Sequence, residues 1–143
     1  MLIIVGFGAA RMSPVLLYTP PVWLRHLNIV FTLIAFILVA AAYVPRNHFK
    51  EKIGHPMLAG VKAWALGHLL SIGMLRDVVL FGAFLVWAIV DFVVSRRRDR
   101  VTGVAYPAGS VTGDAIAVVI GIVIWAAIAF WLHELLIGVN PLA

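Results

Sequence analysis

Four long apolar runs constrain the fold of this sequence more than any other feature. They cover residues 23–44, 56–72, 78–95 and 115–137. A helix of about 20 apolar residues crosses the hydrocarbon core of a bilayer, and the second run is only just long enough. The composition agrees, because 64% of the residues are hydrophobic and 12% are charged, whereas about 25% are charged in soluble domains. The sequence therefore predicts an all-α integral membrane protein, with residues 1–143 forming a single domain and a bundle of about four transmembrane helices.

A fifth apolar segment, residues 1–10, is shorter than the others and ends before Arg11. It is too short to span a bilayer, since a crossing needs about 20 residues. We interpret it as the last half of a transmembrane helix whose beginning is absent from the sequence. An interfacial N-terminus is the alternative. The prediction is thus a partial N-terminal helix in addition to the four longer ones.

Polar and proline-containing segments separate the apolar runs and predict the connections between helices. We expect loops at residues 13–21, 45–54 and 96–113, and a tight turn at 74–76. Asp77 and Asp114 stand just before two of the apolar runs. An aspartate in that place can accept hydrogen bonds from the free N–H groups of a helix. We therefore predict that both residues are N-caps.

The basic residues lie mainly in the short segments between the apolar runs. Of the 11 Lys and Arg residues, seven fall on one side of the predicted bundle and three on the other, while Lys62 lies within a helix. An excess of Lys and Arg marks the cytoplasmic side of a membrane protein. We therefore predict that loops 45–54 and 96–113 are cytoplasmic and that the C-terminus lies outside the cytoplasm. This distribution explains the net charge of +5 without a nucleic-acid partner; the bilayer is the expected partner.

Several kinds of chemistry find no support in the sequence. The chain has no cysteine, which excludes disulfides, thiolate chemistry and cysteine metal sites. It also lacks a Gly-rich phosphate loop, paired carboxylates and a Ser–His–Asp pattern, and no signal peptide is evident. The remaining candidates for a functional site are histidines and charged residues inside the apolar runs.

The run at residues 56–72 carries an unusual number of polar and small residues. His55 precedes Pro56, which disfavours α geometry for His55, and proline suits the first position of a helix. We predict that this His-Pro motif starts the helix. One arc of the helix, at about 100° per residue, then combines Gly60, Trp64, Gly67, His68 and Ser71. Such an arc favours contact with another helix over contact with lipid.

His68 and His133 are predicted at matching depths on two different helices. Each lies four residues before the end of its run, on the side opposite the cytoplasm. Two histidines in this arrangement could coordinate the iron of one haem, and Ser71 could then hold the second ring nitrogen of His68. The alternatives are two unrelated interfacial histidines, or a His68 that is hydrogen-bonded between helices. Spacing alone leaves these interpretations open.

Lys62 and Asp91 are predicted at similar depths on neighbouring antiparallel helices. Each lies about 8 Å inside the cytoplasmic surface. An unpaired charge at that depth is unfavourable, so we predict a structural ion pair between them. The alternative is that each side chain extends to the interface separately.

Five segments of the sequence carry a resemblance to a known family. They are TPPVWLRHL (19–27), AAYVP (41–45), GHPMLAGVKAWALGHLL (54–70), LFGAFLVWAIVD (80–91) and FWLHELLIGVNPL (130–142). On these segments the chain resembles the NnrU family of bacterial membrane proteins. The most specific feature is a His-Pro pair followed by a Gly-His pair thirteen residues later. The resemblance covers nearly the whole chain and implies a location in the bacterial inner membrane.

The resemblance implies a function and a cofactor. NnrU proteins are associated with nitrite and nitric oxide reductase function in denitrification. The family is also related to 15-cis-ζ-carotene isomerase, a membrane enzyme with haem b, in which the position that matches His68 is an expected axial ligand. His55 matches the His-Pro motif of the family. Family members begin with a further helix that bears a His-Ser motif, so the resemblance implies that this chain lacks the family's first helix and leaves Met1 in doubt as the true start.

Three functions remain open at this point. The first is an inner-membrane protein that supports nitrogen-oxide reduction by an undefined mechanism. The second is a haem b-dependent isomerase or redox protein that uses His68. The third is an assembly subunit without a cofactor, which would bind other membrane proteins through small-residue helix faces such as Ala117 and Gly121. Whether the protein is an enzyme is left open by the sequence.

Overall fold

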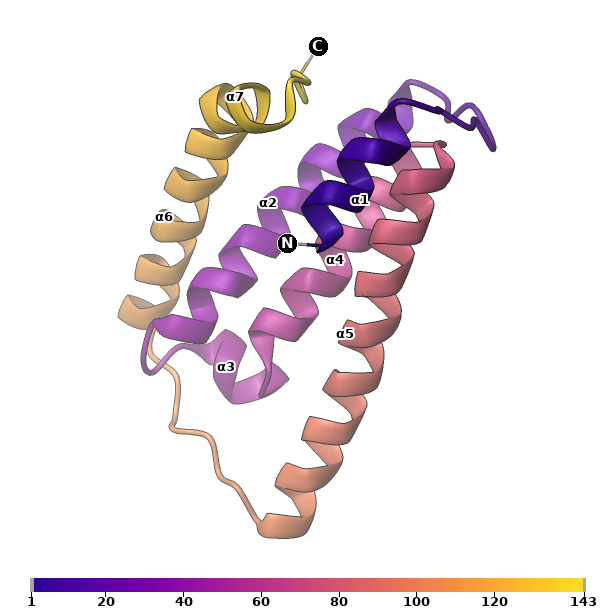
Figure 1. The fold of residues 1–143 in the computed structure, drawn as a ribbon. Helices are drawn as coiled ribbons and strands as arrows, with labels where there is room; N and C mark the ends of the chain where they lie inside the picture. The colour runs from indigo at the N-terminus through magenta and orange to yellow at the C-terminus, as the bar shows by residue number, and fades with distance from the viewer. Residues whose placement is uncertain (1, 143) are drawn as a thin grey trace.

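The computed structural model describes residues 2–142, with side chains from Val5 onward, and every regular element in that part is a helix (Figure 1). This confirms the predicted all-α fold class. Met1 and Ala143 lie outside the described residues. The predictions about the start of the chain and about its C-terminal end concern these two residues. The helices are α1 (Leu2–Arg11), α2 (Trp23–Tyr43), α3 (His48–Ile53), α4 (Pro56–Ser71), α5 (Leu75–Thr102), α6 (Val111–Ala127), the π-helical turn η1 (Ile128–Leu132) and α7 (His133–Ile137).

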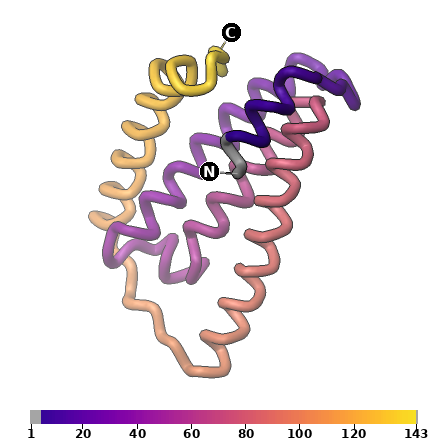
Figure 2. The backbone as a smooth tube through the Cα atoms, in the orientation of Figure 1, coloured from indigo at the N-terminus to yellow at the C-terminus, as the bar shows by residue number. Residues whose placement is uncertain are grey.

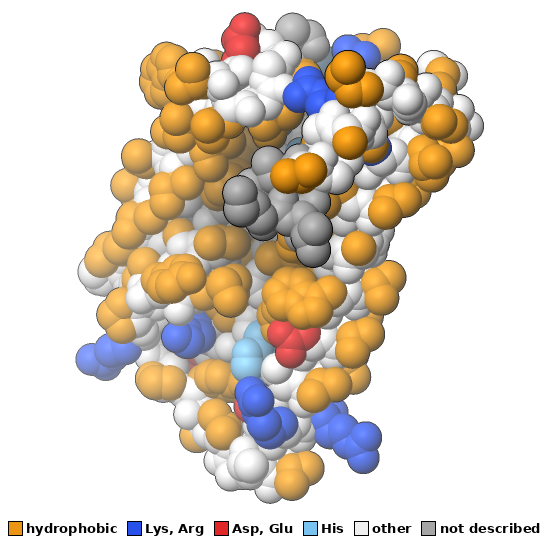
Figure 3. All heavy atoms as spheres, viewed as in Figure 1, with side chains coloured by type: hydrophobic (Ala, Val, Ile, Leu, Met, Phe, Trp, Pro, Cys, Tyr) orange, Lys and Arg blue, Asp and Glu red, His pale blue; other side chains and the backbone are white. Residues whose placement is uncertain are grey.

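Among the described residues, three helices are long and apolar enough to cross a membrane. They are α2, α5 and the continuous stretch from α6 through α7, with lengths of 21, 28 and 27 residues. Helix α4 has 16 residues, about 24 Å at 1.5 Å per residue, so it is shorter than a usual crossing. Apolar side chains cover the flanks of the molecule in Figure 3, while Lys and Arg gather mainly at its lower end. The fold is that of a membrane protein.

The helices form an open row and not a closed bundle. Helix α2 packs against α4 on one side and α6 on the other, and α4 packs in turn against α5. Helix α1 rests on α5 (Figures 1 and 2). In the described part of the chain no contact joins α5 to α6. The row therefore runs in the order α6, α2, α4, α5. The two middle helices, α2 and α4, lie between the two outer ones, α6 and α5.

Small residues let the backbone of α6 approach that of α2. A Cβ atom added at Gly121 would lie 2.5 Å from the Cα atom of Ile37. Ala117, one turn earlier on the same face, is fully buried. One turn later the Trp125 indole N–H donates to the hydroxyl of Thr32 on α2, over 3.2 Å. The small pair Ala117 and Gly121 therefore serves a contact within the chain.

The predicted arc of α4 does face protein, and it divides between two neighbours. A Cβ atom at Gly60 would lie 2.8 Å from the carbonyl oxygen of Ala35, and one at Gly67 would lie 2.8 Å from the Cβ atom of Phe31. These two glycines thus bring α4 against α2. Trp64 and His68 turn the other way and pack on aromatic side chains of α5.

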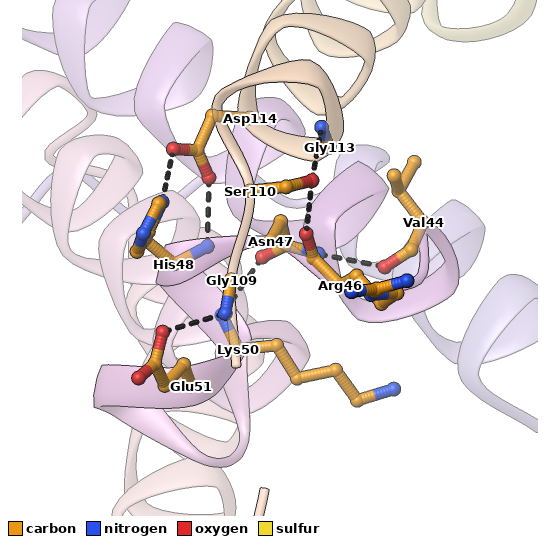
Figure 4. Close-up of polar contacts among 10 residues, drawn as sticks. All are labelled: Val44, Arg46, Asn47, His48, Lys50, Glu51, Gly109, Ser110, Gly113 and Asp114. Atoms are coloured by element: carbon orange, nitrogen blue, oxygen red, sulfur yellow. Dashed lines mark hydrogen bonds and ion pairs between the residues drawn. The ribbon is translucent and has the colours of Figure 1, made fainter. Parts of the chain in front are cut away.

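The lower end of the molecule is tied together by polar contacts between the α2–α3 turn and the start of α6 (Figure 4). Ser110 is the N-cap of α6, and its hydroxyl accepts from the N–H of Gly113 over 3.1 Å. Asp114, predicted as that cap, instead accepts from the N–H of His48, the first residue of α3, over 2.7 Å. Asp114 therefore accepts a hydrogen bond from the first residue of a different helix, α3. We did not predict α3, because it lies within the segment 45–54 that we expected to be a loop.

Helix α5 begins earlier and ends later than predicted. Its N-cap is Met74, so Asp77 is a buried residue of the first turn and not the cap. The helix continues through Arg96 and the following charged residues to Thr102, where Gly103 ends it in the left-handed conformation at φ 67°. Arginine is a good helix former and is favourable near a helix C-terminus. The predicted loop at 96–113 is therefore reduced to residues 103–110.

Candidate functional site

His68 presents a free ring nitrogen inside the protein. Its side chain lies near the end of α4 and is 9% exposed. The Nδ1 atom lies 2.8 Å from the carbonyl oxygen of Trp64, which can only accept, so Nδ1 carries the proton and donates. No described residue forms a hydrogen bond with Nε2. Since the bond made by one ring nitrogen sets the state of the other, Nε2 keeps its lone pair available for a metal.

Aromatic rings surround the His68 imidazole and fix its orientation. The ring stacks on Phe81 of α5 with a centroid distance of 4.4 Å and an interplanar angle of 22°. The Trp64 ring lies 5.2 Å from His68 and packs edge-on against Phe81 at 4.9 Å and Phe84 at 5.6 Å. These rings leave few rotamers open to the histidine and keep water from one of its faces. The site is thus apolar and ordered around one donor nitrogen.

Ser71 does not play the supporting role that we predicted from the sequence. Its hydroxyl donates to the backbone carbonyl of His68 over 3.3 Å and does not contact the ring. The orienting acceptor is the carbonyl of Trp64, four residues earlier in the same helix. Which backbone carbonyl lies near the His68 ring depends on the rotamer of the histidine. The side chains packed around the histidine fix that rotamer.

His133 shares one feature with His68, an Nδ1 atom bonded to a backbone carbonyl, but it is only partly buried. It is the first residue of α7, directly after the π-helical turn η1, and such turns are frequent at functional sites. Its Nδ1 donates to the carbonyl oxygen of Val139 over 2.7 Å, which again leaves Nε2 with a lone pair. Each of the two Nε2 atoms is therefore a neutral imidazole donor of the kind that haem iron binds.

His55 and Pro56 form the predicted helix start at the opposite end of α4. His55 is the N-cap and Pro56 the first helical residue. The Nε2 atom of His55 lies 2.6 Å from a carboxylate oxygen of Asp99, which also accepts from the Tyr106 hydroxyl. Burial raises the pKa of Tyr106, and its hydrogen bond to Asp99 raises this pKa further, so the hydroxyl remains a donor at neutral pH. This cluster is separate from His68 and joins α4, α5 and loop 103–110.

The predicted ion pair between Lys62 and Asp91 is not formed in the described structure. The Nζ atom of Lys62 lies 3.6 Å from the centroid of the Phe92 ring. Asp91 instead accepts from the hydroxyl of Ser95 over 3.3 Å. Adjacent residues on a helix point about 100° apart, so the register that brings Phe92 to Lys62 turns Asp91 away. A cation–π contact takes the place of the expected pair.

Sequence reasoning missed Asp99 and Tyr106 as partners of His55. Both lie in the segment that we predicted to be a loop, and no spacing rule connects them to a residue more than 40 positions away. The described residues also hold no group of three or more His, Asp or Glu side chains that could bind a metal ion by themselves. His68 and His133 stay candidate metal ligands, each with an Nε2 atom that no described residue bonds.

The fold and this site define a class: a helical membrane protein with a buried histidine whose Nδ1 atom is bonded to a backbone carbonyl. A comparison with protein families identifies the chain more closely. The model of the family described as NnrU protein matches residues 1–141. The chain therefore belongs to the NnrU family. No curated protein and no solved structure matches it.

Proposed function

We propose that this protein is a haem b-binding protein of the bacterial inner membrane that supports nitrogen-oxide reduction. The single observation that carries the haem assignment is His68, which is buried with Nδ1 bonded to Trp64 and Nε2 without a partner among the described residues. Membership of the NnrU family supports the link to nitrogen oxides, because the family resemblance implies it.

In this proposal each residue of the site has a distinct task. His68 would hold the iron through Nε2, and the Trp64 carbonyl keeps the imidazole in one tautomer and orientation. His133 would supply a second nitrogen ligand through Nε2, with the Val139 carbonyl in the same supporting role. Phe81 and Trp64 limit the access of water. When bound, haem b supplies one-electron redox chemistry, and the same site would serve the isomerase alternative that the family resemblance implies.

The small-residue helix faces no longer support the alternative function, an assembly subunit without a cofactor. Its argument rested on small-residue faces that another membrane protein could approach. Gly60 and Gly67 of α4 and Gly121 of α6 are already packed against α2. Their tight backbone contacts leave no room there for a further helix.

The haem assignment predicts a defined spectral result. The protein produced with haem supplied should show a Soret band typical of low-spin haem b. His68→Ala should abolish it, and His133→Ala should abolish it or convert it to a high-spin form. The exposed His26 provides the control, because His26→Ala should leave the spectrum unchanged. Absence of haem from the unaltered protein, or an unchanged spectrum in His68→Ala, would contradict the proposal.

The link to nitrogen oxides needs a separate test in cells. A denitrifying strain that lacks this gene should grow poorly on nitrite without oxygen and should have low nitric oxide reductase activity. The unaltered gene should restore both, whereas the His68→Ala gene should not. Full restoration by His68→Ala would separate the cellular role from the histidine site.

The proposed topology also predicts a measurable result. Loops 45–54 and 103–110 lie at the same end of the helices, opposite α7 (Figure 1), and the larger share of Lys and Arg supports a cytoplasmic position for that end. Alkaline phosphatase fused after the last residue should be active, because it requires export, and green fluorescent protein fused there should be dark. A fluorescent fusion with inactive phosphatase would reverse the proposed orientation.

A further inference from the structure

A cavity of about 490 Å³ lies between α1 and α5, apart from the two histidines. Its wall is almost wholly apolar. The residues that matter for the argument are Phe7 and Ala10 on α1, and Arg76, Leu80, Ala83 and Phe84 on α5. This volume is within the range of small-molecule sites, about 300–1,000 Å³.

One polar group at the edge of this cavity lacks a partner. The Nε atom of Arg76 is buried, and no described residue accepts a hydrogen bond from it. The nearest carboxylate oxygen, on Asp77, is 3.6 Å away, beyond a hydrogen bond. A buried guanidinium N–H without an acceptor is costly. The Nε atom itself faces Asp77, but Arg76 lines the cavity and its side chain is 21% exposed, so its other guanidinium N–H groups are open to an oxygen acceptor from outside the described chain.

The position of Arg76 indicates which kind of acceptor this is. Arg76 is the second residue of α5, at the level where a spanning helix leaves the hydrocarbon for the headgroups. Phe84, at the other end of the cavity wall, is eight residues further along and about 12 Å deeper. The cavity thus presents a guanidinium at headgroup depth and an apolar wall at acyl-chain depth.

Charge narrows the choice among lipids. Arg76 and Arg11, the last residue of α1 and the neighbour of the cavity-lining Ala10, carry two positive charges, and Asp77 offsets one of them. No acidic side chain lines the described cavity, and the adjacent Asp77 carboxylate already pairs with Arg76 over 3.6 Å, so the ammonium group of a zwitterionic headgroup would find no free carboxylate there. Guanidinium groups bind phosphate with strong, charge-assisted hydrogen bonds. An anionic phospholipid satisfies both the charge and the depth.

We propose that the cavity between α1 and α5 binds one anionic phospholipid, with its phosphate on Arg76 and an acyl chain along Leu80, Ala83 and Phe84. This site is independent of the haem assignment, since it shares no donor with His68 or His133. It would hold α1 against α5, a contact that otherwise rests on few residues.

The test measures lipid retained by the purified full chain. Nanodiscs containing equal amounts of phosphatidylglycerol and phosphatidylethanolamine, with identical acyl chains, supply the lipids, and native mass spectrometry after detergent release counts them. We expect one tightly held phosphatidylglycerol per protein. Arg76→Gln should lower its retention about tenfold, the change expected for loss of one charge-assisted hydrogen bond. Ala83→Phe, which fills the cavity, should lower retention to a similar extent.

Matched variants separate this site from general lipid contact. Arg97→Gln removes the same charge from an exposed position at the other end of α5, and Val86→Phe adds bulk at a side chain that is 64% exposed; neither should alter retention. Glycerol phosphate should not compete, because it has no acyl chain. Equal retention of both lipids, or equal loss in Arg76→Gln and Arg97→Gln, would overturn the proposal. A normal thermal unfolding profile shows that each variant is folded.

Discussion

Replacing Gly121 with leucine is expected to destabilise the protein by about 3 kcal/mol, the upper part of the range for overpacking. A Cβ atom at this position would lie 2.5 Å from the Cα and 2.8 Å from the backbone nitrogen of Ile37. Backbone atoms cannot move aside as the end of a side chain can, so α6 must shift away from α2. The shift would also stretch the bond from Trp125 to Thr32. Thermal unfolding followed by circular dichroism should show a midpoint about 10 °C lower.

Gly82 offers the matched control for this prediction. It also lies within a spanning helix, but a Cβ atom there would have nothing within 4 Å. Gly82→Leu should therefore leave the unfolding midpoint nearly unchanged, or raise it slightly because leucine has the higher helix propensity. Equal midpoints for Gly121→Leu and Gly82→Leu would show that α2 and α6 are not packed as closely as described here.

Replacing Asn47 with leucine should be at least as damaging, although the two side chains have similar size. Asn47 is fully buried. Its amide nitrogen donates to the carbonyl oxygens of Ala41 and Val44 over 2.8 and 2.6 Å, and its amide oxygen accepts from the N–H of Lys50 over 2.8 Å. A leucine cannot make any of these three bonds. Buried groups left without partners cost about 1–3 kcal/mol each, so a loss of about 3 kcal/mol or more is expected.

The reason for this dependence lies in Pro45. In a helix the carbonyl of Ala41 would accept from the N–H of the residue four positions later, but proline has no N–H. Asn47 supplies the missing donor to Ala41. Its side chain also caps α3 by accepting from the N–H of Lys50 (Figure 4). Unfolding in a graded series of sodium dodecyl sulfate concentrations should measure the loss. Asn140 is the control, because it is exposed and its replacement by leucine should change stability little. A neutral Asn47→Leu would mean that water reaches these carbonyls.

The sequence by itself determined the class of fold and most helix positions. Long apolar runs at low charge can be stable only as helices in a membrane, and this conclusion needs no knowledge of how the helices pack. Proline set the start of α4 at Pro56, because its ring prescribes the backbone on both sides of it. The distribution of small residues correctly indicated which faces of α4 and α6 meet other helices. These features depend on properties of single residues or on regular spacing along one helix.

Helix ends in the polar segments were harder to predict, because competing caps have similar intrinsic strength. Asp114 was a reasonable N-cap, yet Ser110 performs that role and Asp114 accepts from His48 of α3. The charged stretch after Ser95 resembled a loop by composition. It continues as helix, with Asp99 buried against His55. The local sequence does not predict which residue, distant along the chain, will form a hydrogen bond with a polar side chain.

Only the tertiary structure decided which side chains meet across helices. Lys62 faces Phe92 and not Asp91, because a difference of one residue in helix register rotates a side chain by about 100°. The same dependence on register and rotamer gives His68 its acceptor on Trp64 and its stacking on Phe81. Periodicity indicated that His68 faces protein, since that requires only its position on one helix. The free nitrogen that makes His68 a ligand candidate follows from the packing of α4 against α5, because neighbouring side chains decide the rotamer of a buried ring.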